Sequence, residues 1–399
     1  MYAGFRHMRR MAGVARTLAR HDALFPLQRL GVPRIALRGL SLLLLAPRKK
    51  GLSGKRPGER LAAALTALGP AFVKIGQALS VRPDLVGDDI ADDLTSLQDR
   101  LPPYDGALAR AAVEDELGKP LKDIYATFDD VPVAAASIAQ VHRATTTEGA
   151  AVAVKVLRPG IEAAFARDLD LARWAAARIE HHRPDLRRLR PIEAVETIVR
   201  SVEMEMDLRF EAAAADELRR NFEDEPGFSV PAVDWQRTGR RVLTTEWVDA
   251  MPVNEIDRIR AKGIDLQATV ANIAKVFFLQ VFRDGFFHAD LHPGNIFIDD
   301  DGVVHAVDFG IMGRLDRRTR QYLAEMLHGF LTGDYRRVAD VHIRAGYVPA
   351  DQSADEFAQA ARSIAEPILG LPLSEISLAR LLAQIRNLPN IIDVRRKRG

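Results

Sequence analysis

The spacing of apolar and polar positions changes along the chain, and each change predicts a different kind of element. Residues 59–82 place apolar side chains three and four apart around Gly69-Pro70, which predicts two consecutive helices. A further helix is predicted over 107–117, ended by Gly118. Residues 131–157 instead predict two strands joined by a turn near Glu148-Gly149.

The second of these strands alternates strictly, and the alternation orients a lysine. Val152, Val154 and Val156 alternate with Ala153 and Lys155. Because successive side chains of a strand point to opposite faces, Lys155 is predicted to project from the face opposite the valines.

The remaining pattern is mostly helical. Helical stretches are predicted over 161–182 and 191–222, short strands around 228–249, and an apolar helix over 265–283 that leads directly into HADLHPGN. Beyond Gly310 the pattern predicts helix to the end of the chain. A small mixed lobe followed by a mostly helical lobe predicts an α+β fold with a ligand cleft between the lobes.

Composition adds a charge asymmetry that the hydrophobic pattern does not show. Residues 1–58 carry thirteen Lys or Arg and one acid, Asp22, so this segment is +12 while the rest of the chain is −10. Such a segment suits an anionic membrane surface, with apolar partners at Phe5, Met8, Met11, Leu18, Leu24 and Phe25. The alternatives are nucleic acid, which the lack of aromatic stacking positions disfavours, and a basic helix packed on the acidic body.

No apolar run is long enough for a transmembrane helix. The longest, 39–46 and 276–282, fall short of the ~18–20 residues that a membrane span requires. Cys is absent, which excludes disulfides and fits a reducing compartment. We therefore expect a cytoplasmic protein, bound peripherally to the inner membrane.

Two short motifs carry the candidate chemistry. In HADLHPGN (288–295), Asp290 and Asn295 lie five apart, and Asp308 begins an Asp-Phe-Gly thirteen residues later. This spacing is typical of a kinase catalytic loop followed by its magnesium-binding motif. Asp290 suits the proton acceptor, Asn295 and Asp308 suit magnesium ligands, and His288 is expected to brace the loop. Asp, Asn and Pro-Gly are also ordinary turn formers, but the two motifs in this order make that reading improbable.

A phosphate-binding cation is expected upstream on a strand, and Lys155 in AVAVKVL is suited to that role. The preceding turn, which is glycine-rich in protein kinases, is alanine-rich here, so phosphates are expected to be held differently. The resemblance to kinases implies that the residues of this segment line the nucleotide: Val133, Ala134, Ala135, Ala136, Ser137, Ile138, Ala139, Gln140 and Val141.

Five stretches together resemble the ABC1/ADCK/UbiB family of atypical kinases, and within it the bacterial UbiB members of ubiquinone biosynthesis. They are KIGQ (74–77), AAASIAQVHRA (134–144), EMD (205–207), HADLHPGN and DFG. The resemblance covers residue 59 to the end of the chain. It implies a bilobal protein kinase-like fold with an N-terminal helical extension, a small mixed N-lobe and a mostly helical C-lobe.

The resemblance also implies roles for individual residues. Glu211 would pair with Lys155, and both would act with Asp290 in catalysis on ATP or ADP with Mg2+. Four residues of the KxGQ and ExD motifs would gate the cleft where a peptide enters an ordinary kinase: Lys74, Gln77, Glu205 and Asp207. The implied parts are a basic segment (1–58), a KxGQ helical extension (59–130), an N-lobe with inserted helices (131–250) and a helical C-lobe (251–399).

The implied activity is an ATP- and magnesium-dependent kinase or ATPase that supports ubiquinone biosynthesis, with ubiquinone-biosynthesis enzymes and prenylated phenols as partners. Two alternatives stay open, a small-molecule hydroxyl phosphotransferase and a non-hydrolysing nucleotide-binding scaffold. Family members often finish with an apolar membrane-spanning pair, whereas this sequence finishes with Arg395-Arg396-Lys397-Arg398. Peripheral rather than integral membrane attachment is therefore expected.

Overall fold

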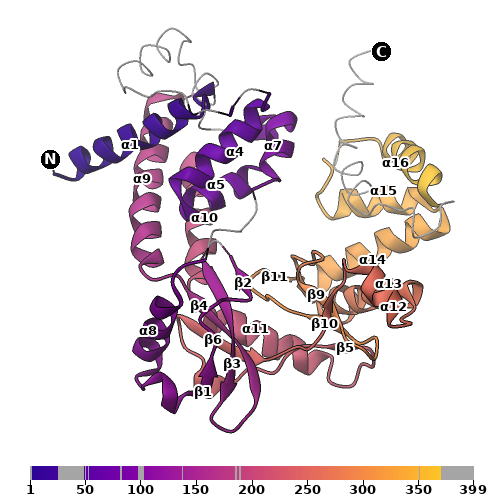
Figure 1. The fold of residues 1–399 in the computed structure, drawn as a ribbon. Coiled ribbons are helices and arrows are strands. Elements are labelled where there is room, and N and C mark those ends of the chain that lie inside the picture. Colours follow the sequence, from indigo (N-terminus) through magenta and orange to yellow (C-terminus); the bar gives the residue numbers. More distant parts are fainter. Residues whose placement is uncertain are drawn as a thin grey trace. The chain divides into compact units, whose positions relative to one another are not determined.

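The computed structural model describes residues 2–25, 49, 51–52, 54–80, 83–97, 103–136, 138–184, 187, 190–349 and 351–369. It divides into two compact units (Figure 1). The first unit is Met1–Glu217 with Pro231–Asp249, and the second is Leu218–Val230 with Ala250–Gly399.

The KIGQ motif of the first unit lies in a small helical bundle. Its helices are α4 (Pro57–Leu68), α5 (Pro70–Ser80), α6 (Pro83–Val86) and α7 (Asp88–Leu94). Gly69, at φ 112°, separates α4 from α5, so the two predicted helices are confirmed. The buried side chains Leu61, Leu65, Phe72 and Leu94 form the core between them.

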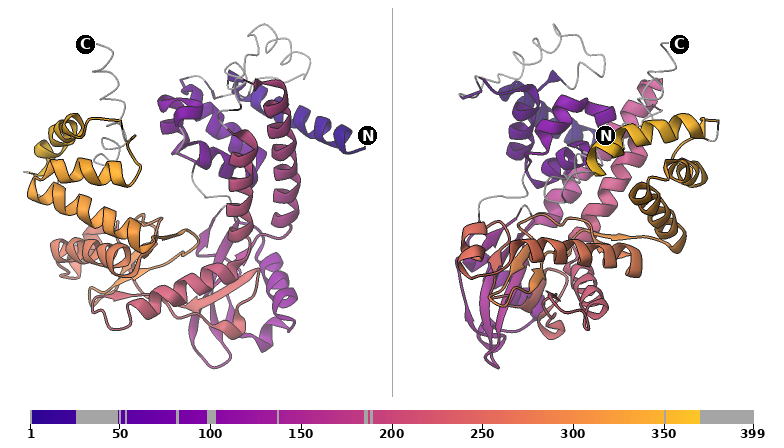
Figure 2. Two further views of the ribbon diagram at one scale, coloured as in Figure 1. Left: turned by 180° about the vertical axis from the view of Figure 1, so that it is seen from behind. Right: turned by 90° about the vertical axis from the view of Figure 1, so that its right-hand side faces the viewer.

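Three longer helices flank this bundle: α1 (Tyr2–Arg20), α9 (Ile161–His182) and α10 (Pro191–Glu205). Helices α9 and α10 run side by side, and α1 packs on α9 and α4 (Figure 2). Leu24 is buried, and Leu18 and Phe25 pack against the bundle core. This corrects the expectation that these three side chains contact a membrane, because they pack within the protein instead.

A five-stranded antiparallel sheet forms the rest of the first unit. Strands β1 (Tyr125–Phe128), β3 (Ala139–Thr146), β4 (Ala151–Leu157) and β6 (Val242–Glu246) are adjacent in this order, and β2 (Ala134–Ala135) pairs with β3. The three valines of β4 pack with Val113 of α8 (Gly106–Leu117), which covers one face. Leu157 and Leu243 pack on the other face with Leu208 of α11 (Leu208–Asn221). The predicted opposition of Lys155 and the valines is therefore confirmed.

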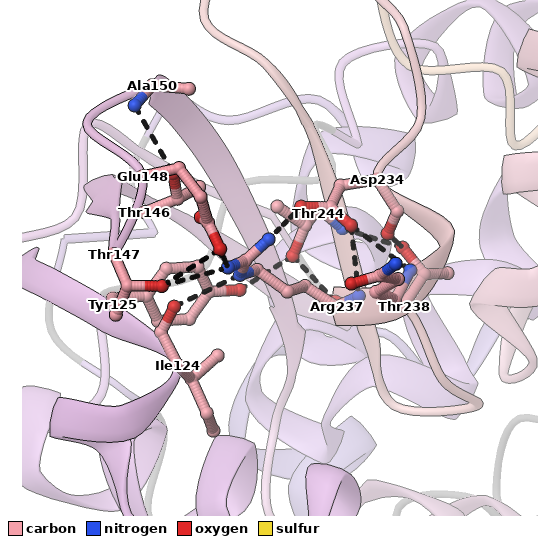
Figure 3. Close-up of polar contacts among 11 residues, drawn as sticks. Ile124, Tyr125, Thr146, Thr147, Glu148, Ala150, Asp234, Arg237, Thr238 and Thr244 are labelled. Carbon is pink, nitrogen blue, oxygen red and sulfur yellow. Dashed lines mark hydrogen bonds and ion pairs between the residues drawn. The ribbon is translucent and has the colours of Figure 1, made fainter.

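Arg237 joins the edges of this sheet (Figure 3). It ends the short helix η3 (Trp235–Arg237), and its guanidinium donates to the Ile124 carbonyl at 3.0 Å and to Asp234 at 2.7 Å. It also donates to Glu148 in the β3–β4 turn at 2.6 Å, which lowers the pKa of the Glu148 carboxyl to about 2. The turn that precedes the lysine-bearing strand is thereby fixed to the neighbouring strands.

The second unit combines short strands with helices. Strands β5 (Phe228–Ser229), β10 (Val304–Ala306), β9 (Ile296–Ile298) and β7 (Met251–Pro252) form one sheet, and β8 (Phe286–His288) pairs with β11 (Met312–Arg314). The helices are α12 (Ile256–Ala261), α13 (Leu266–Phe278), the π-helical turn η4 (Leu279–Asp284), α14 (Arg317–Thr332), α15 (Tyr335–Arg344) and α16 (Ala354–Leu369). Both units contain helices and β-sheet, which confirms the α+β class.

Two sequence predictions about elements were wrong in detail. The helix predicted over 191–222 breaks at Met206-Asp207, because the Asp207 carboxylate accepts from the Arg209 N–H and begins α11 as a new helix. The all-helical prediction beyond Gly310 missed β11, whose pairing with β8 decides its conformation. Residues 370–399 lie outside the described part of the chain, as do the apolar run 39–46 and Ser137.

Candidate functional site

Lys155 and Glu211 form a close ion pair in the first unit. The Lys155 ammonium lies 2.8 Å from Oε1 and 2.9 Å from Oε2 of Glu211. Strand β4 supplies the lysine and the first turns of α11 supply the carboxylate, and their side chains are only 17% and 8% exposed. The pairing that the sequence predicted is therefore present, and it holds a cation in a defined position on one face of the sheet.

The alanine-rich segment is a tight hairpin between β2 and β3. Ala134 pairs with Val141 and Ala135 with Gln140. The Ala136 N–H donates to the Ala139 carbonyl at 2.8 Å, and the Val133 N–H to the Val141 carbonyl at 2.8 Å. These two amide N–H groups are therefore occupied within the hairpin itself.

Within this segment, Gln140 has a different environment from its neighbours. Its side chain is fully buried, and its amide exchanges hydrogen bonds with the Tyr104 backbone at 3.1 and 3.3 Å. The amide nitrogen also lies 2.8 Å from Nε2 of His142. The structure thus places this predicted nucleotide-lining side chain inside the sheet.

In the second unit, His288 organises the HADLHPGN loop between β8 and β9. The ring is 1% exposed, its Nδ1 accepts from the Asp290 N–H at 3.2 Å, and its Nε2 donates to the Val307 carbonyl at 3.2 Å. Burial lowers the pKa of His288, which keeps the ring neutral and in this tautomer. His288 therefore braces the backbone of Asp290 and the strand end that precedes Asp308.

Asn295 completes this arrangement. It is buried, its side-chain nitrogen donates to the Asp290 carbonyl at 3.1 Å, and its own carbonyl accepts from the Val307 N–H at 2.9 Å. Asp308 follows at φ 64°, a left-handed conformation that Asp tolerates and that often marks functional sites. The Asp290 side chain is 47% exposed, so it is accessible to a substrate hydroxyl.

The donor set of this loop fits magnesium that arrives with a phosphate. Mg2+ prefers oxygen ligands and is usually held by one or two protein carboxylates or amides together with phosphate oxygens. The Asn295 amide donates through its nitrogen, so its oxygen would be the atom that holds Mg2+, and the Asp308 carboxylate would be the second ligand. In the described part of the chain, no group of three or more His, Asp or Glu side chains is arranged to hold a metal ion.

The four predicted gating residues all lie within the first unit and have three different sets of contacts. Lys74 of α5 pairs with Glu205 of α10 at 2.8 Å, with side chains 12% and 13% exposed. Asp207 instead pairs with Arg209 at 2.6 Å, and this arginine lowers the pKa of the Asp207 carboxyl. The Gln77 amide donates to the Leu97 carbonyl at 3.3 Å.

Sequence reasoning missed three residues that support these groups. Gln280, in the π-helical turn, accepts the His288 N–H at 2.9 Å, and Tyr104 and Arg158 contact the alanine-rich hairpin and its strands. In the sequence, the π-helical turn η4 cannot be told from an ordinary apolar α-helix. No local pattern indicates the positions of Tyr104 and Arg158, because their contacts join distant parts of the chain.

An antiparallel sheet with a Lys–Glu pair, followed by a braced HADLHPGN loop and an Asp-Phe-Gly, defines a protein kinase-like fold. The sequence matches the ABC1 atypical kinase-like domain over residues 96–342. The chain belongs to this ABC1 family of atypical kinases, as the motif resemblance predicted.

Individual relatives agree with this assignment. The chain is 42% identical over 370 residues to the "Probable protein kinase UbiB" of Marinobacter nauticus, covering 92% of this chain and 67% of that protein. It is 45% identical over 334 residues to the protein of the same name from Xylella fastidiosa, covering 82% of this chain and 60% of the relative. The chain thus spans 60% to 67% of the length of these relatives.

A solved structure shares the fold. The Mycobacterium tuberculosis protein Rv3197, in its complex with erythromycin, matches with a TM-score of 0.56 and 26% identity, covering 79% of this chain and 86% of that chain. No helix among the residues that the structure describes is long and apolar enough to cross a membrane.

Proposed function

We propose that this protein is an ATP- and magnesium-dependent atypical kinase or ATPase that supports ubiquinone biosynthesis at a membrane surface. The observation that carries the proposal is the Lys155–Glu211 pair, with both carboxylate oxygens within 2.9 Å of the ammonium. In kinases this pair positions the lysine that binds the nucleotide phosphates. The ubiquinone pathway is proposed from the resemblance to UbiB proteins.

The HADLHPGN loop and Asp308 supply the other groups that phosphoryl transfer requires. Asp290 accepts the proton of the attacking hydroxyl or water, and the braces from His288 and Asn295 fix the backbone that carries it. Asn295 and Asp308 hold magnesium, which neutralises the charge of the phosphates during transfer. In kinases, the lysine of the ion pair and these three types of side chain act on one nucleotide.

The alanine-rich hairpin favours nucleotide turnover over ordinary protein phosphorylation. A glycine-rich loop offers its amide N–H groups to phosphates, whereas two amides here are already paired within the hairpin. The buried Lys74–Glu205 pair supports a fixed role for KxGQ and ExD rather than solvated helix surfaces. We therefore propose no peptide acceptor.

Helix α1 supports attachment to an anionic membrane surface through one of its faces. Arg9, Arg16 and Arg20 are exposed and spaced to share a side of the helix, next to Met8, which is 62% exposed. On a neighbouring side of the helix, Arg6 and Arg10 pair with Asp170 and Asp168 of α9. Some arginines of α1 therefore pair with carboxylates of α9, and others are exposed to solvent.

Phosphate release by the purified full-length protein tests the proposal. We expect magnesium-dependent ATP hydrolysis that Asp290→Asn abolishes and that vesicles with anionic lipid stimulate more than neutral vesicles. Replacing Arg9, Arg16 and Arg20 with Gln is preferable to deleting residues 1–58, because α1 packs on α4 and α9 and its removal would expose their core. The triple variant should lose the lipid stimulation and retain basal hydrolysis.

Two outcomes would replace the proposal. Stoichiometric phosphate transfer to a soluble alcohol would indicate a small-molecule hydroxyl phosphotransferase, which shares the catalytic-loop pattern. Magnesium-dependent nucleotide binding with no hydrolysis above the Asp290→Asn background would indicate a nucleotide-binding scaffold.

A further inference from the structure

Arg158, the residue after β4, holds two carbonyl groups of the alanine-rich hairpin. Its guanidinium donates to the Ala136 carbonyl from two nitrogens, at 3.1 and 3.3 Å, and its backbone N–H donates to the Ile138 carbonyl at 2.8 Å. Ala136 and Ile138 flank the tip of the hairpin. One residue therefore fixes both sides of the turn to the end of the strand that carries Lys155.

Tyr104 packs against this arginine. The Arg158 guanidinium carbon lies 5.4 Å from the centre of the Tyr104 ring, a cation–π distance. The Tyr104 hydroxyl donates to the carbonyls of Val156 and Leu157 at 3.2 and 3.3 Å. Burial raises the pKa of the Tyr104 phenol, so the hydroxyl stays protonated and remains a donor at physiological pH.

The backbone of Tyr104 is held as well. Its N–H and carbonyl both bond to the buried amide of Gln140, and the Gln140 nitrogen lies 2.8 Å from His142. The three side chains of Tyr104, Arg158 and Gln140 thus connect the segment before α8 to both strands next to the hairpin.

The consequence for phosphate binding follows from the hairpin's own hydrogen bond. The Ala136 N–H is donated to the Ala139 carbonyl at 2.8 Å, so it is not available to an anion while the turn keeps this shape. Holding the Ala136 and Ile138 carbonyls keeps the turn in this shape. Release of the turn would free the amide to rotate toward a phosphate, as the amides of glycine-rich loops do.

We propose that Arg158, supported by Tyr104, is a positioning residue that clamps the alanine-rich hairpin in a form that binds nucleotide weakly. The inference rests on the proposed function, because it concerns affinity for magnesium and ATP. It assigns Arg158 to restraint of the loop, and not to direct contact with the phosphates. The clamp therefore sets nucleotide affinity without taking part in the chemical step.

The test compares Arg158→Lys, which keeps the positive charge and loses the two-nitrogen contact, with Tyr104→Leu, which removes the aromatic face and hydroxyl. The matched control is Arg143→Lys, since Arg143 is an exposed arginine of β3 that stacks on Trp247 at 4.8 Å. For both clamp variants we expect the Kd for a fluorescent ATP analogue with magnesium, and the KM for ATP, to fall roughly five-fold, the effect of one hydrogen bond. The kcat should stay within about two-fold of the unaltered protein.

A second readout needs no nucleotide. Amide hydrogen exchange over residues 133–141 of the ligand-free protein should be faster in Arg158→Lys and Tyr104→Leu, and unchanged in the Arg143→Lys control. Ala135→Gly relaxes the same turn, so combining it with Arg158→Lys should give less than the product of the two separate affinity gains.

The outcomes separate the clamp from the proposed function. Unchanged exchange in the clamp variants, or an unchanged or raised Kd despite faster exchange, would overturn the clamp. A lowered affinity in Arg158→Lys would instead assign Arg158 to direct phosphate contact. If the unaltered protein binds no nucleotide, the proposed function is rejected together with the effect on affinity, while the exchange rates still decide whether Arg158 restrains the hairpin.

Discussion

The Lys155–Glu211 pair has a proposed role in nucleotide binding, and it also affects the stability of the fold. Both side chains are more than four-fifths buried, and each charge is stabilised by the other at 2.8 Å. Removing one partner takes a stabilising opposite charge away from a poorly solvated group, whereas removing both takes away the two buried charges together. This asymmetry allows the structural and functional roles of the pair to be separated.

We predict that Lys155→Met lowers the free energy of unfolding by on the order of 3 kcal/mol and weakens nucleotide binding at least about ten-fold. The double variant Lys155→Met with Glu211→Leu should recover part of the stability and none of the binding. Urea unfolding and nucleotide titration measure the two effects, with the exposed Lys119→Met as control. Equal stability of the single and double variants would show that the pair is not effectively buried.

Three buried histidines make the stability of the fold sensitive to pH. Burial is the main cause that lowers the pKa of His142, His288 and His342 below the ordinary value of 6.5. In the unfolded chain these rings take up protons as the pH falls through 6.5, while in the folded protein they resist protonation. The unfolded state therefore binds more protons below this pH, and folding stability declines.

We accordingly predict a lower free energy of unfolding at pH 5.5 than at pH 7.5, measured by urea titration. His342→Leu, which replaces a ring that is 8% exposed, should reduce this dependence. The exposed His328→Asn serves as control and should not reduce it. A stability that is constant between these two pH values would contradict the assignment of neutral buried rings.

Residue-scale predictions from the sequence succeeded where the local pattern carried the information. Strict alternation placed Lys155 opposite the valines, and the spacing of Asp290 and Asn295 placed them on one braced loop. The contact between Tyr104 and Arg158 joins residues far apart in the chain, and no local pattern encodes it. The burial of Gln140 could not be predicted either, because its partner, the Tyr104 backbone, is distant in the sequence.

At the scale of elements, Gly76 shows why the KxGQ motif contains a glycine. A Cβ atom built at this position would lie 2.3 Å from the Leu97 side chain and 2.7 Å from the Leu65 side chain. Both leucines are buried, so they have little room to move. The glycine lets α5 pack closely on α4 and on the segment after α7, which fixes the helix that carries Lys74 and Gln77.

We predict that Gly76→Ala lowers the free energy of unfolding by about 1–2 kcal/mol through overpacking, although alanine favours helix. Gly13→Ala is the matched control, since Gly13 also lies in a helix and no atom stands within 4 Å of its added methyl group. The control should be neutral or stabilising. A Gly76→Ala protein as stable as the control would show that the glycine is not required for packing.

Element boundaries were less predictable than element types. The helices over 107–117 and 161–182 agree closely with α8 and α9, since Gly118 and the apolar period mark them locally. The break before α11 depends on the Asp207 cap. Strand β11 depends on β8, whose paired residues lie 24 to 28 positions earlier in the chain. Tertiary pairing of this kind overrides the local pattern.

At the scale of the whole molecule, the candidate chemistry is distributed over two units. The first contains the Lys155–Glu211 pair, the alanine-rich hairpin and the KIGQ helix, and the second contains Asp290, Asn295 and Asp308. The unit boundary falls within α11, the helix that carries Glu211. A nucleotide that uses groups of both units should therefore stabilise segments of both when it binds.

Amide hydrogen exchange with and without a non-hydrolysable ATP analogue and magnesium tests this central claim most directly. We predict slower exchange around Lys155 and across residues 288–310, lost in Asp308→Asn and retained in the exposed control Asp301→Asn. Protection confined to one unit, or the same magnesium-dependent protection in Asp308→Asn, would contradict the account.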